Sequence, residues 1–461
     1  MHSLKPTLLN TLLRATGEGE RITFQQQCER SQWWNPEQLS ALQLTRLRAL
    51  LQHAYQNCEY YRDTINKADF DVTSIDSVDD LRALPQLTKS IIQQNTTSLV
   101  ASNWPESDTI QNFTGGSTGQ PLRLYYNKSR HESRVAITMR HDGWAGRFIG
   151  GRVAYFWGAP RDAPSQKLQS RVRRWLEGST LWLDTGNIYP QQFTIFNEQL
   201  IRFRPTVIVA YANSLSLFAN YLLEKGLTTC HPKSIITSAE ILTDESRQVI
   251  EKVFGCPIFN RYGCREVSVI ASECEEHEGL HISAEGLHIE IVDQHDQPVK
   301  QGESGDILVT DLLNYAMPLI RYRIGDLGSW MHGPCKCGRG LPRLKSVDGR
   351  VTDFIVGSDN QLVSGVFLAT YVVAQRPSLG RVQIVQSRAG HVELLVCPSD
   401  AFDATSDISY LQQSMARHVG PIDIEVTLVD EIEPEPSGKL LFCKSTISRS
   451  ATSPLLAGSP R

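Results

Sequence analysis

The sequence predicts an α/β protein with a large N-terminal domain, built of parallel α/β sheets and a small antiparallel β unit, and a small α+β C-terminal domain. Short β-branched runs at residues 206–210 and 234–237 are each followed by a helix-like stretch, at residues 214–225 and 243–254. Because alternation of strands with helices is typical of parallel pairing, these segments predict the parallel sheet.

The pattern changes beyond residue 286. Two strand-like runs, at residues 287–292 and 306–309, are separated by a turn near Asp296. This arrangement predicts the antiparallel unit. A strand, a helix and two paired strands then predict a C-terminal module of about 110 residues, a usual domain size. Its elements are expected at residues 354–356, 367–374, 381–386 and 391–397.

The elements before the parallel sheet are mostly helical. Apolar residues at steps of three and four predict one long helix over residues 36–66. Residues 87–90, Leu-Thr-Lys-Ser, can cap a helix that begins near Ile91. A helix over residues 129–144 and a strand over residues 152–157 follow.

The composition is that of a globular protein: 461 residues, of which 41% are hydrophobic and 21% charged. The formal net charge of -4 provides no basic field, which argues against nucleic acid as a partner. No apolar run reaches the length of about 18 residues that a membrane span needs. We therefore expect a cytoplasmic protein with no membrane span.

Residues 112–121 read Asn-Phe-Thr-Gly-Gly-Ser-Thr-Gly-Gln-Pro. Such a loop can wrap an anion, because glycines let backbone N–H groups turn toward one point and hydroxyl groups add donors. It lacks the Gly-Lys-Ser/Thr ending of a Walker loop. The alternative is a solvated turn.

Four further segments follow this loop in a recognisable order: residues 260–266, residues 321–326, Gly349–Arg350 and residues 436–439. With these five motifs, from about Leu39 to Lys439, the sequence resembles the adenylate-forming superfamily. Within it the sequence is similar to the phenylacetate-CoA ligase-like branch, which includes CapK-type proteins. Each motif alone is weak, but their shared order makes the resemblance specific.

The resemblance implies an N-terminal domain at residues 1–348, a hinge at 349–353 and a mobile C-terminal lid domain at 354–461. It also implies the chemistry: a carboxylate attacks the α-phosphorus of ATP, giving an acyl-adenylate and pyrophosphate, and a thiol or amine then displaces AMP. Glu266 would hold Mg²⁺ and Lys439 would supply positive charge at the α-phosphate; these are the expected catalytic residues.

The glycine loop would hold the β- and γ-phosphates, Tyr262 would lie near the adenine, and Asp326 would accept from the ribose hydroxyls. The residues expected to bind the nucleotide are Thr114, Gly115, Gly116, Ser117, Thr118, Gly119, Ser238, Ala239, Glu240, Tyr262, Asp326 and Arg350. As an alternative, Ser238 caps a helix that begins near Thr243.

The chain departs from the family pattern at two places. Gln120 stands where many relatives carry lysine, so a phosphate contact is expected to be missing. At the hinge, Thr352 stands where many relatives have aspartate, and Asp353 follows one position later. The hinge residue is therefore left open.

A metal site is expected from the cysteines. Cys335 and Cys337 form a tight pair, and Cys274 with His281 supplies a further thiolate and an imidazole. Three sulfurs and one nitrogen close the tetrahedral shell of a structural zinc. His281 is chosen over His277 because it follows Gly279-Leu280, as in the resembling branch; His277 is the fallback, and the other alternative is an unliganded, buried Cys274.

Three residues lie in segments that border the substrate in relatives: Trp144, Tyr211 and Asn213. Aromatic residues at such positions also occur as plain core packing. The expected function is ATP-dependent activation of a carboxylic acid followed by transfer to CoA, with ATP, Mg²⁺ and structural Zn²⁺ as cofactors. The alternatives are transfer to an amine or a carrier-protein thiol, and a non-catalytic nucleotide-binding protein; a homodimer is an open option.

Overall fold

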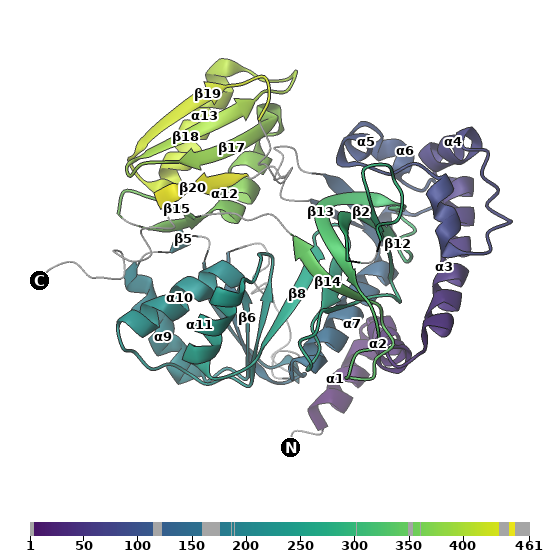
Figure 1. The fold of residues 1–461 in the computed structure, drawn as a ribbon, viewed down its shortest axis with the longest axis horizontal. Helices are drawn as coiled ribbons and strands as arrows, with labels where there is room; N and C mark the ends of the chain where they lie inside the picture. Colours follow the sequence, from purple (N-terminus) through teal and green to yellow (C-terminus); the bar gives the residue numbers. More distant parts are fainter. Residues whose placement is uncertain are drawn as a thin grey trace, which may run out of the picture. The chain divides into compact units, whose positions relative to one another are not determined.

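The computed structural model describes most of the chain: residues 4–113, 122–158, 176–185, 187–188, 190–300, 302–348, 354–359, 361–432 and 442–447. These residues form two compact units (Figure 1). Unit 1 comprises residues 4–113, 122–149 and 259–348. Unit 2 comprises the described residues of 150–258 and 354–447.

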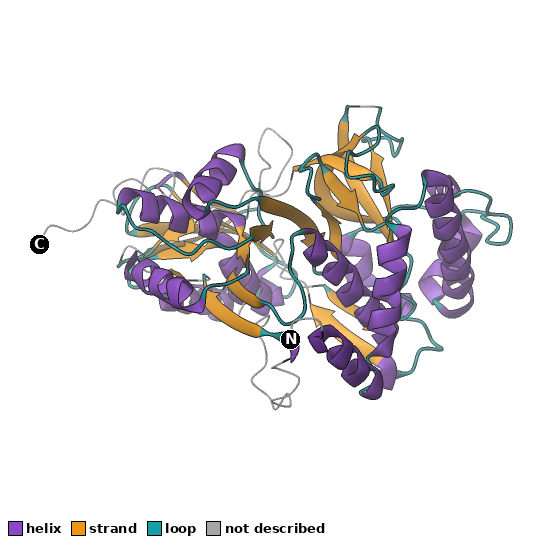
Figure 2. Ribbon diagram, turned by 90° about the horizontal axis from the view of Figure 1, so that it is seen from below, coloured by secondary structure: helices purple, strands orange, loops and turns teal. Residues whose placement is uncertain are grey.

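Unit 1 begins with helices, which Figure 2 separates by colour from its strands. They are α1 (Leu4–Ala15), α2 (Gly19–Ser31), α3 (Pro36–Asn57), α4 (Glu59–Lys67), α5 (Lys89–Gln94), α6 (Thr96–Leu99) and α7 (Lys128–Trp144), with 3-10 turns η1 (Val78–Ala83) and η2 (Glu106–Asp108). Asn35 starts α3 through a capping box with Gln38, and Thr88, within the segment expected to cap this helix, caps α5.

The prediction of one long helix over residues 36–66 is wrong in one respect, because two helices, α3 and α4, cover this range. Cys58 adopts an extended backbone and separates α3 from α4. At the end of α3 the Asn57 side chain donates to the carbonyl oxygen of His53 at 2.9 Å, and the backbone N–H of Cys58 donates to that of Ala54.

The strands of unit 1 form an antiparallel sheet that is larger than the unit expected from the sequence. In spatial order the strands are β11 (Leu287–Val292), β12 (Ser304–Asp311), β13 (Tyr322–Met331), β14 (Arg343–Asp348), β10 (Leu280–Ile282), β9 (Ser268–Ser272) and β8 (Ile258–Cys264). A separate hairpin pairs β1 (Thr109–Phe113) with β2 (Arg123–Asn127). The apolar core of unit 1 lies between this sheet and helices α3 to α6, and includes Leu47, Leu50, Ile289, Ile307 and Tyr322.

Unit 2 contains the parallel sheet that the sequence predicts. Its strands, in spatial order, are β7 (Ser234–Ser238), β6 (Val207–Tyr211), β3 (Arg152–Trp157) and β4 (Ser179–Asp184), and all neighbours are parallel. Helices α9 (Pro190–Phe203), α10 (Ala212–Glu224) and α11 (Asp244–Phe254) pack on it. Every residue of β6 is buried, as expected for a strand covered on both faces.

The C-terminal residues have a sheet and core of their own. Strands β19 (Asp423–Leu428), β18 (His391–Cys397), β17 (Arg381–Gln386) and β20 (Cys443–Ser445) lie in this order, beside helices α12 (Gly365–Tyr371) and α13 (Ala404–Val419). A smaller sheet joins β15 (Phe354–Val356), β16 (Leu362–Ser364) and β5 (Asn187–Ile188). The α+β module expected from the sequence is therefore present; its 3-10 turns are η4 (Val373–Gln375) and η5 (Pro377–Leu379).

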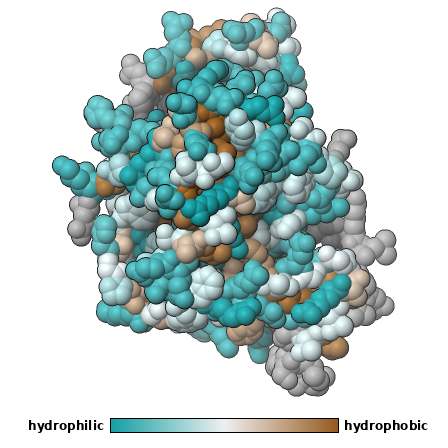
Figure 3. All heavy atoms as spheres, turned by 90° about the vertical axis from the view of Figure 1, so that its right-hand side faces the viewer, coloured by the Kyte–Doolittle hydropathy of each residue, from teal (hydrophilic) through white to brown (hydrophobic). Residues whose placement is uncertain are grey.

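The surface on the side where Figure 1 draws α3 and α4 is mostly hydrophilic, with apolar side chains in scattered patches (Figure 3). In the part of the chain that the structure describes, no helix has the length and apolar character to cross a membrane.

Candidate functional site

Several predicted site residues lie outside the described residues. These are the glycine loop from Thr114 to Gly119, Arg350, Lys439 and the expected hinge at 349–353. Their roles stay predictions. The other predicted residues can be placed within their own units.

Tyr262 and Asp326 are in contact in unit 1. Tyr262 lies on β8 and Asp326 on β13, and the phenol oxygen of Tyr262 donates to Oδ2 of Asp326 at 3.0 Å. Burial and the Asp326 carboxylate raise the pKa of Tyr262 well above its ordinary value, so the phenol stays protonated and the carboxylate stays the acceptor. Two motifs that are 64 positions apart in the chain thus meet at one hydrogen bond.

Glu266 lies in the turn between β8 and β9 and is 9% exposed. Its Oε1 accepts from the hydroxyl of Tyr322, which is fully buried at the start of β13. Gly263 makes this tight turn possible, because an added Cβ would stand 2.5 Å from the carbonyl oxygen of Ser268. Tyr322 was not among the residues predicted from the sequence, although it stands in the middle of the Arg-Tyr-Arg motif.

In unit 2, Glu240 is connected to α10. Its Oε2 accepts from the backbone N–H of Asn213, in the first turn of that helix, at 2.8 Å. The N-terminus of a helix favours a carboxylate, yet burial raises the pKa of Glu240 to about 7. Ala239, immediately before it, has a positive φ of 69°, an uncommon backbone conformation for a residue with a Cβ.

The start of the next helix shows whether Ser238 is a helix cap. Thr243 caps α11, with its hydroxyl accepting from the backbone N–H of Ser246 at 3.2 Å, so Ser238 is not the cap. Tyr211 is 5% exposed and its ring lies 4.4 Å from that of Trp157. A role for Tyr211 and Asn213 in holding the acid stays a prediction.

Cys274, His281, Cys335 and Cys337 come together in unit 1, with their ligand atoms all within 4.8 Å of one another. The sulfurs of Cys274 and Cys335 are 3.7 Å apart, and that of Cys337 is 3.4 Å from Nε2 of His281. Gly338, with a φ of +80°, turns the chain back after Cys337 and bonds the carbonyl oxygen of Cys335. Four residues from three separate segments therefore form one compact ligand set.

The donor set fits a tetrahedral metal ion. Nδ1 of His281 is bonded to the carbonyl oxygen of Leu341 at 3.2 Å, which leaves Nε2 to face the sulfurs. Burial lowers the pKa of His281 to about 4, so the imidazole is neutral, as a metal ligand must be. His277 is placed differently: its Nδ1 lies 3.1 Å from Oε2 of Glu273.

Trp144 also lies at this cluster. Its ring stands edge-on to His281 at 5.7 Å and its Nε1 donates to Oε1 of Gln32 at 2.9 Å. The guanidinium of Arg339 lies between the rings of Trp33 and Trp144, and the backbone N–H of Arg339 donates to the sulfur of Cys337. These contacts give Trp144 a packing role; contact with the acid stays a prediction. Arg339 was not predicted from the sequence, although it stands two residues after Cys337.

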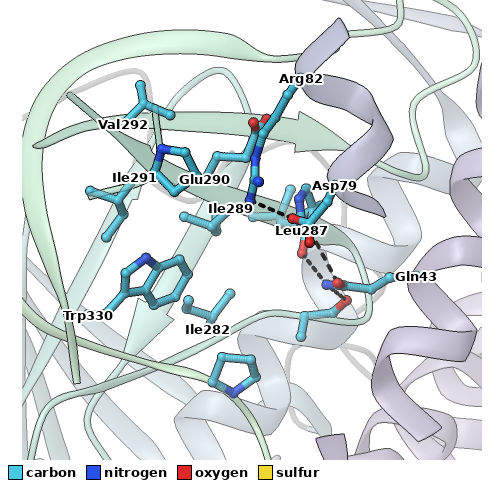
Figure 4. A pocket seen from close by; sticks show the side chains of 14 residues that line it. Gln43, Asp79, Arg82, Ile282, Leu287, Ile289, Glu290, Ile291, Val292 and Trp330 are labelled. Carbon is cyan, nitrogen blue, oxygen red and sulfur yellow. Dashed lines mark hydrogen bonds and ion pairs between the residues drawn. The ribbon is translucent and has the colours of Figure 1, made fainter. Parts of the chain in front are cut away.

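A cavity of about 240 Å³ opens in unit 1 (Figure 4). Trp330, Ile282 and Ile289 supply apolar walls, and Arg82 and Asp79, which bond each other, lie beside it. None of the predicted site residues that the structure describes lines this cavity.

Comparisons with known proteins find relatives that cover most of this chain. Residues 355–446 match the family model described as the CapK C-terminal domain. The chain is 24% identical to Protein CapK of Staphylococcus aureus over 412 residues, covering 89% of this chain and 90% of that protein. It is 26% identical to phenylacetate-coenzyme A ligase of Escherichia coli K12, covering 83% of this chain and 87% of that protein.

The fold is shared with a solved structure. The crystal structure of 2-hydroxyisobutyryl-CoA ligase in complex with 2-HIB-AMP and CoA superposes with a TM-score of 0.64 at 18% identity, covering 93% of this chain and 94% of that chain. Sequence relatives over most of the chain, the C-terminal family match and the shared fold agree. The predicted resemblance to the adenylate-forming superfamily, in the branch of CapK and the phenylacetate-CoA ligases, is therefore confirmed, and residues 355–446 belong to the CapK C-terminal domain family.

Proposed function

We propose that this protein is an AMP-forming ligase that activates a carboxylic acid as an acyl-adenylate, releases pyrophosphate and transfers the acyl group to the thiol of CoA. The observation that carries the proposal is the meeting of two predicted nucleotide motifs in unit 1. Tyr262 bonds Asp326 and Tyr322 bonds Glu266, so both carboxylates are held by phenols of the other motif.

Glu266 fits a Mg²⁺ ligand. It is a buried carboxylate, and the hydroxyl of Tyr322 at Oε1 fixes its orientation without neutralising its charge. Hard divalent cations prefer carboxylate and phosphate oxygens. Bound Mg²⁺ would supply charge neutralisation for the departing pyrophosphate, while Glu266 holds its position in the turn after β8.

Asp326 would orient the ribose. The hydroxyl of Tyr262 uses one lone pair of Oδ2, and a carboxylate offers about four lone-pair positions that can accept hydrogen bonds. The ribose hydroxyls would donate to the remaining positions. Lys439 would place a positive charge where the carboxylate oxygen meets the α-phosphate, since phosphoryl transfer depends on positioning and electrostatic stabilisation.

The Cys/His cluster would hold a structural zinc. Its four ligands leave no open position for substrate, which is the pattern of a structural rather than a catalytic zinc site. All ten cysteines are free thiols in the structure. Because reduced cysteines are typical of a reducing compartment, we place the protein in the cytoplasm.

The acceptor has an alternative. Four of the relatives are named for CoA, but CapK, which is similar to 89% of this chain, has a name that specifies no acceptor. An amine or a carrier-protein thiol is therefore the second candidate for the acceptor.

The test uses the first half-reaction, because it needs no acceptor. ATP–pyrophosphate exchange is measured with a panel of aryl, arylacetic and short aliphatic acids in the presence of Mg²⁺. Exchange with at least one acid supports the ligase, and mass spectrometry of the products with CoA and with amines then identifies the acceptor. ATP binding without exchange for any acid would indicate the non-catalytic alternative.

A further inference from the structure

The turn that carries Glu266 has an unusual backbone. Ser268, which starts β9, has a positive φ of 75°, and the pairing of β8 with β9 shifts its register between Tyr262 and Gly263. A non-glycine residue with positive φ is strained and persists only when its surroundings hold it. Contacts from outside the turn should therefore keep Glu266 in place.

Two arginines of α7 make such contacts. Nη2 of Arg134 donates to the carbonyl oxygen of Arg265 at 2.9 Å, and Nη2 of Arg130 donates to that of Val267 at 3.1 Å. Residues four apart lie on one face of a helix, so the two guanidinium groups reach the turn together. The carbonyls immediately before and after Glu266 are thus each held by an arginine.

The same carbonyl of Arg265 has a second donor. Nδ2 of Asn112 lies 2.9 Å from it. Asn112 is in the last residues of β1, directly before the glycine loop in the sequence. A carbonyl oxygen has two lone pairs, and here one is used by α7 and the other by the strand that leads to the loop.

The arginines are themselves fixed. Arg130 is 1% exposed, and its Nε donates to Oδ2 of Asp311 at 2.7 Å. The guanidinium of Arg134 lies 4.7 Å from the centre of the Tyr126 ring. Burial lowers the pKa of Arg134, but arginine remains charged at any ordinary pH. The turn is therefore held by charged donors with defined orientations.

We propose that Arg130 and Arg134 are positioning residues for Glu266, and that Asn112 supports the same turn through the carbonyl of Arg265. The expected effect of this positioning on the binding of a metal–nucleotide complex rests on the proposed function. The hydrogen bonds themselves make a separate prediction about the backbone of the turn.

Arg134 is the residue to change, because loss of Arg130 leaves the buried Asp311 carboxylate without its partner and threatens folding. The variants are Arg134→Leu, Arg134→Lys and Asn112→Ala. The matched control is Arg30→Leu, an exposed helical arginine that donates to the carbonyl of Gln26 in its own helix. Mn²⁺–ATP binding is measured by electron paramagnetic resonance, with Mn²⁺ in place of Mg²⁺, and amide hydrogen exchange is followed over residues 263–268.

We expect Arg134→Leu to weaken Mn²⁺–ATP binding about 10-fold, the scale for losing a charge-assisted hydrogen bond. Metal-free ATP should bind within about twofold of wild type, since the position of Glu266 matters only through the metal. Arg134→Lys keeps a charged donor and should recover part of the loss. Hydrogen exchange over residues 263–268 should become faster in Arg134→Leu and Asn112→Ala but not in Arg30→Leu.

Equal Mn²⁺–ATP binding and equal exchange in Arg134→Leu and wild type would overturn the proposal. An equal loss for metal-free and metal-bound ATP would also overturn it, because Arg134 would then act directly on the phosphates. If wild-type protein binds no Mn²⁺–ATP, the proposed function fails, and the exchange of residues 263–268 alone decides the positioning role.

Discussion

The hydroxyl of Tyr322 donates to Oε1 of Glu266 at 3.1 Å, in the interior of unit 1. Both residues are buried, and 56 positions separate them in the chain. The contact connects the first residue of β13 with the turn after β8. It makes the orientation of the expected Mg²⁺ ligand depend on a residue that itself touches no substrate in the proposed mechanism.

Tyr322→Phe should therefore raise the Mg²⁺ requirement of the enzyme beyond what its loss of folding stability explains. The change leaves a buried carboxylate oxygen without its donor, which costs about 1–3 kcal/mol. The concentration of Mg²⁺ for half-maximal pyrophosphate exchange should rise several-fold, on the scale of that loss. Urea unfolding measures the stability change in the same samples.

Tyr61→Phe is the matched control, because the Tyr61 hydroxyl is also buried and donates to the carbonyl oxygen of Pro318 at 2.9 Å. It should lower stability with no change in the Mg²⁺ requirement. A Tyr322→Phe protein with the same Mg²⁺ requirement as Tyr61→Phe contradicts the role given to Tyr322.

The zinc site makes a prediction that does not depend on activity. Purified protein should contain about one zinc per chain, and Cys335→Ser should lose both the metal and thermal stability, because metal binding is coupled to folding. Elemental analysis and thermal melting measure the two effects. Cys397→Ser, outside the cluster, should keep the metal; metal-free wild-type protein that melts at an unchanged temperature after chelation counts against the site.

The pKa of Glu240 predicts a pH dependence of stability. Burial raises it from 4.5 to about 7, so the folded protein holds this proton at pH values where the unfolded chain has released it. The folded state then binds more protons, and the contribution of Glu240 to stability falls as pH rises from about 4.5 to 7.

Urea unfolding at pH 5 and pH 7 checks this sign in wild type and Glu240→Gln. Other groups also titrate in this range, so the difference between the two proteins is the relevant quantity. Wild type should lose more stability than Glu240→Gln over this interval. An identical pH dependence would show that Glu240 stays ionised, with the N–H groups of α10 compensating for burial.

Local patterns predicted much of the fold. The β-branched runs gave the parallel strands β6 and β7. The choice of His281 rather than His277 for the cysteine cluster came instead from the resemblance, because His281 follows Gly279-Leu280 as in that branch. The helix α13 was missed, although its buried residues Leu411, Met415 and Val419 recur every four positions. The helices α1, α2 and α9 were missed as well.

The contacts at the candidate site were beyond such reasoning. Tyr322 with Glu266 and Arg134 with Arg265 are pairs separated by 56 and 131 positions, and only the folded chain brings them together. Side chains that hold a functional group through the backbone leave no local pattern in the sequence. The break at Cys58, where the backbone becomes extended, was likewise not visible in the apolar periodicity, because that periodicity continues from α3 into α4.

The domain boundary can be tested by limited proteolysis without ligand. The expected hinge at 349–353 lies outside the described residues, whereas residues 354–447 contain a core that includes Ile384, Leu394 and Leu411. Cleavage should occur near 349–353 and release a fragment that begins near residue 354, because proteases cut exposed, weakly packed segments first. First cleavage at another place, with residues 349–353 intact, would contradict this boundary.

The last prediction separates the two half-reactions. Lys439 should serve adenylation by placing positive charge at the α-phosphate, whereas attack by a thiol on a finished acyl-adenylate forms no such phosphorane. Lys439→Ala should therefore lower pyrophosphate exchange by at least about 10²-fold, the scale for one preorganised electrostatic contact. The same variant should still convert acyl-adenylate supplied from outside. Lys444→Ala, an exposed lysine on β20, is the control and should behave as wild type in both assays. Near-normal exchange in Lys439→Ala would mean that another cation serves the α-phosphate, and the catalytic assignment would then have to move from the C-terminal domain.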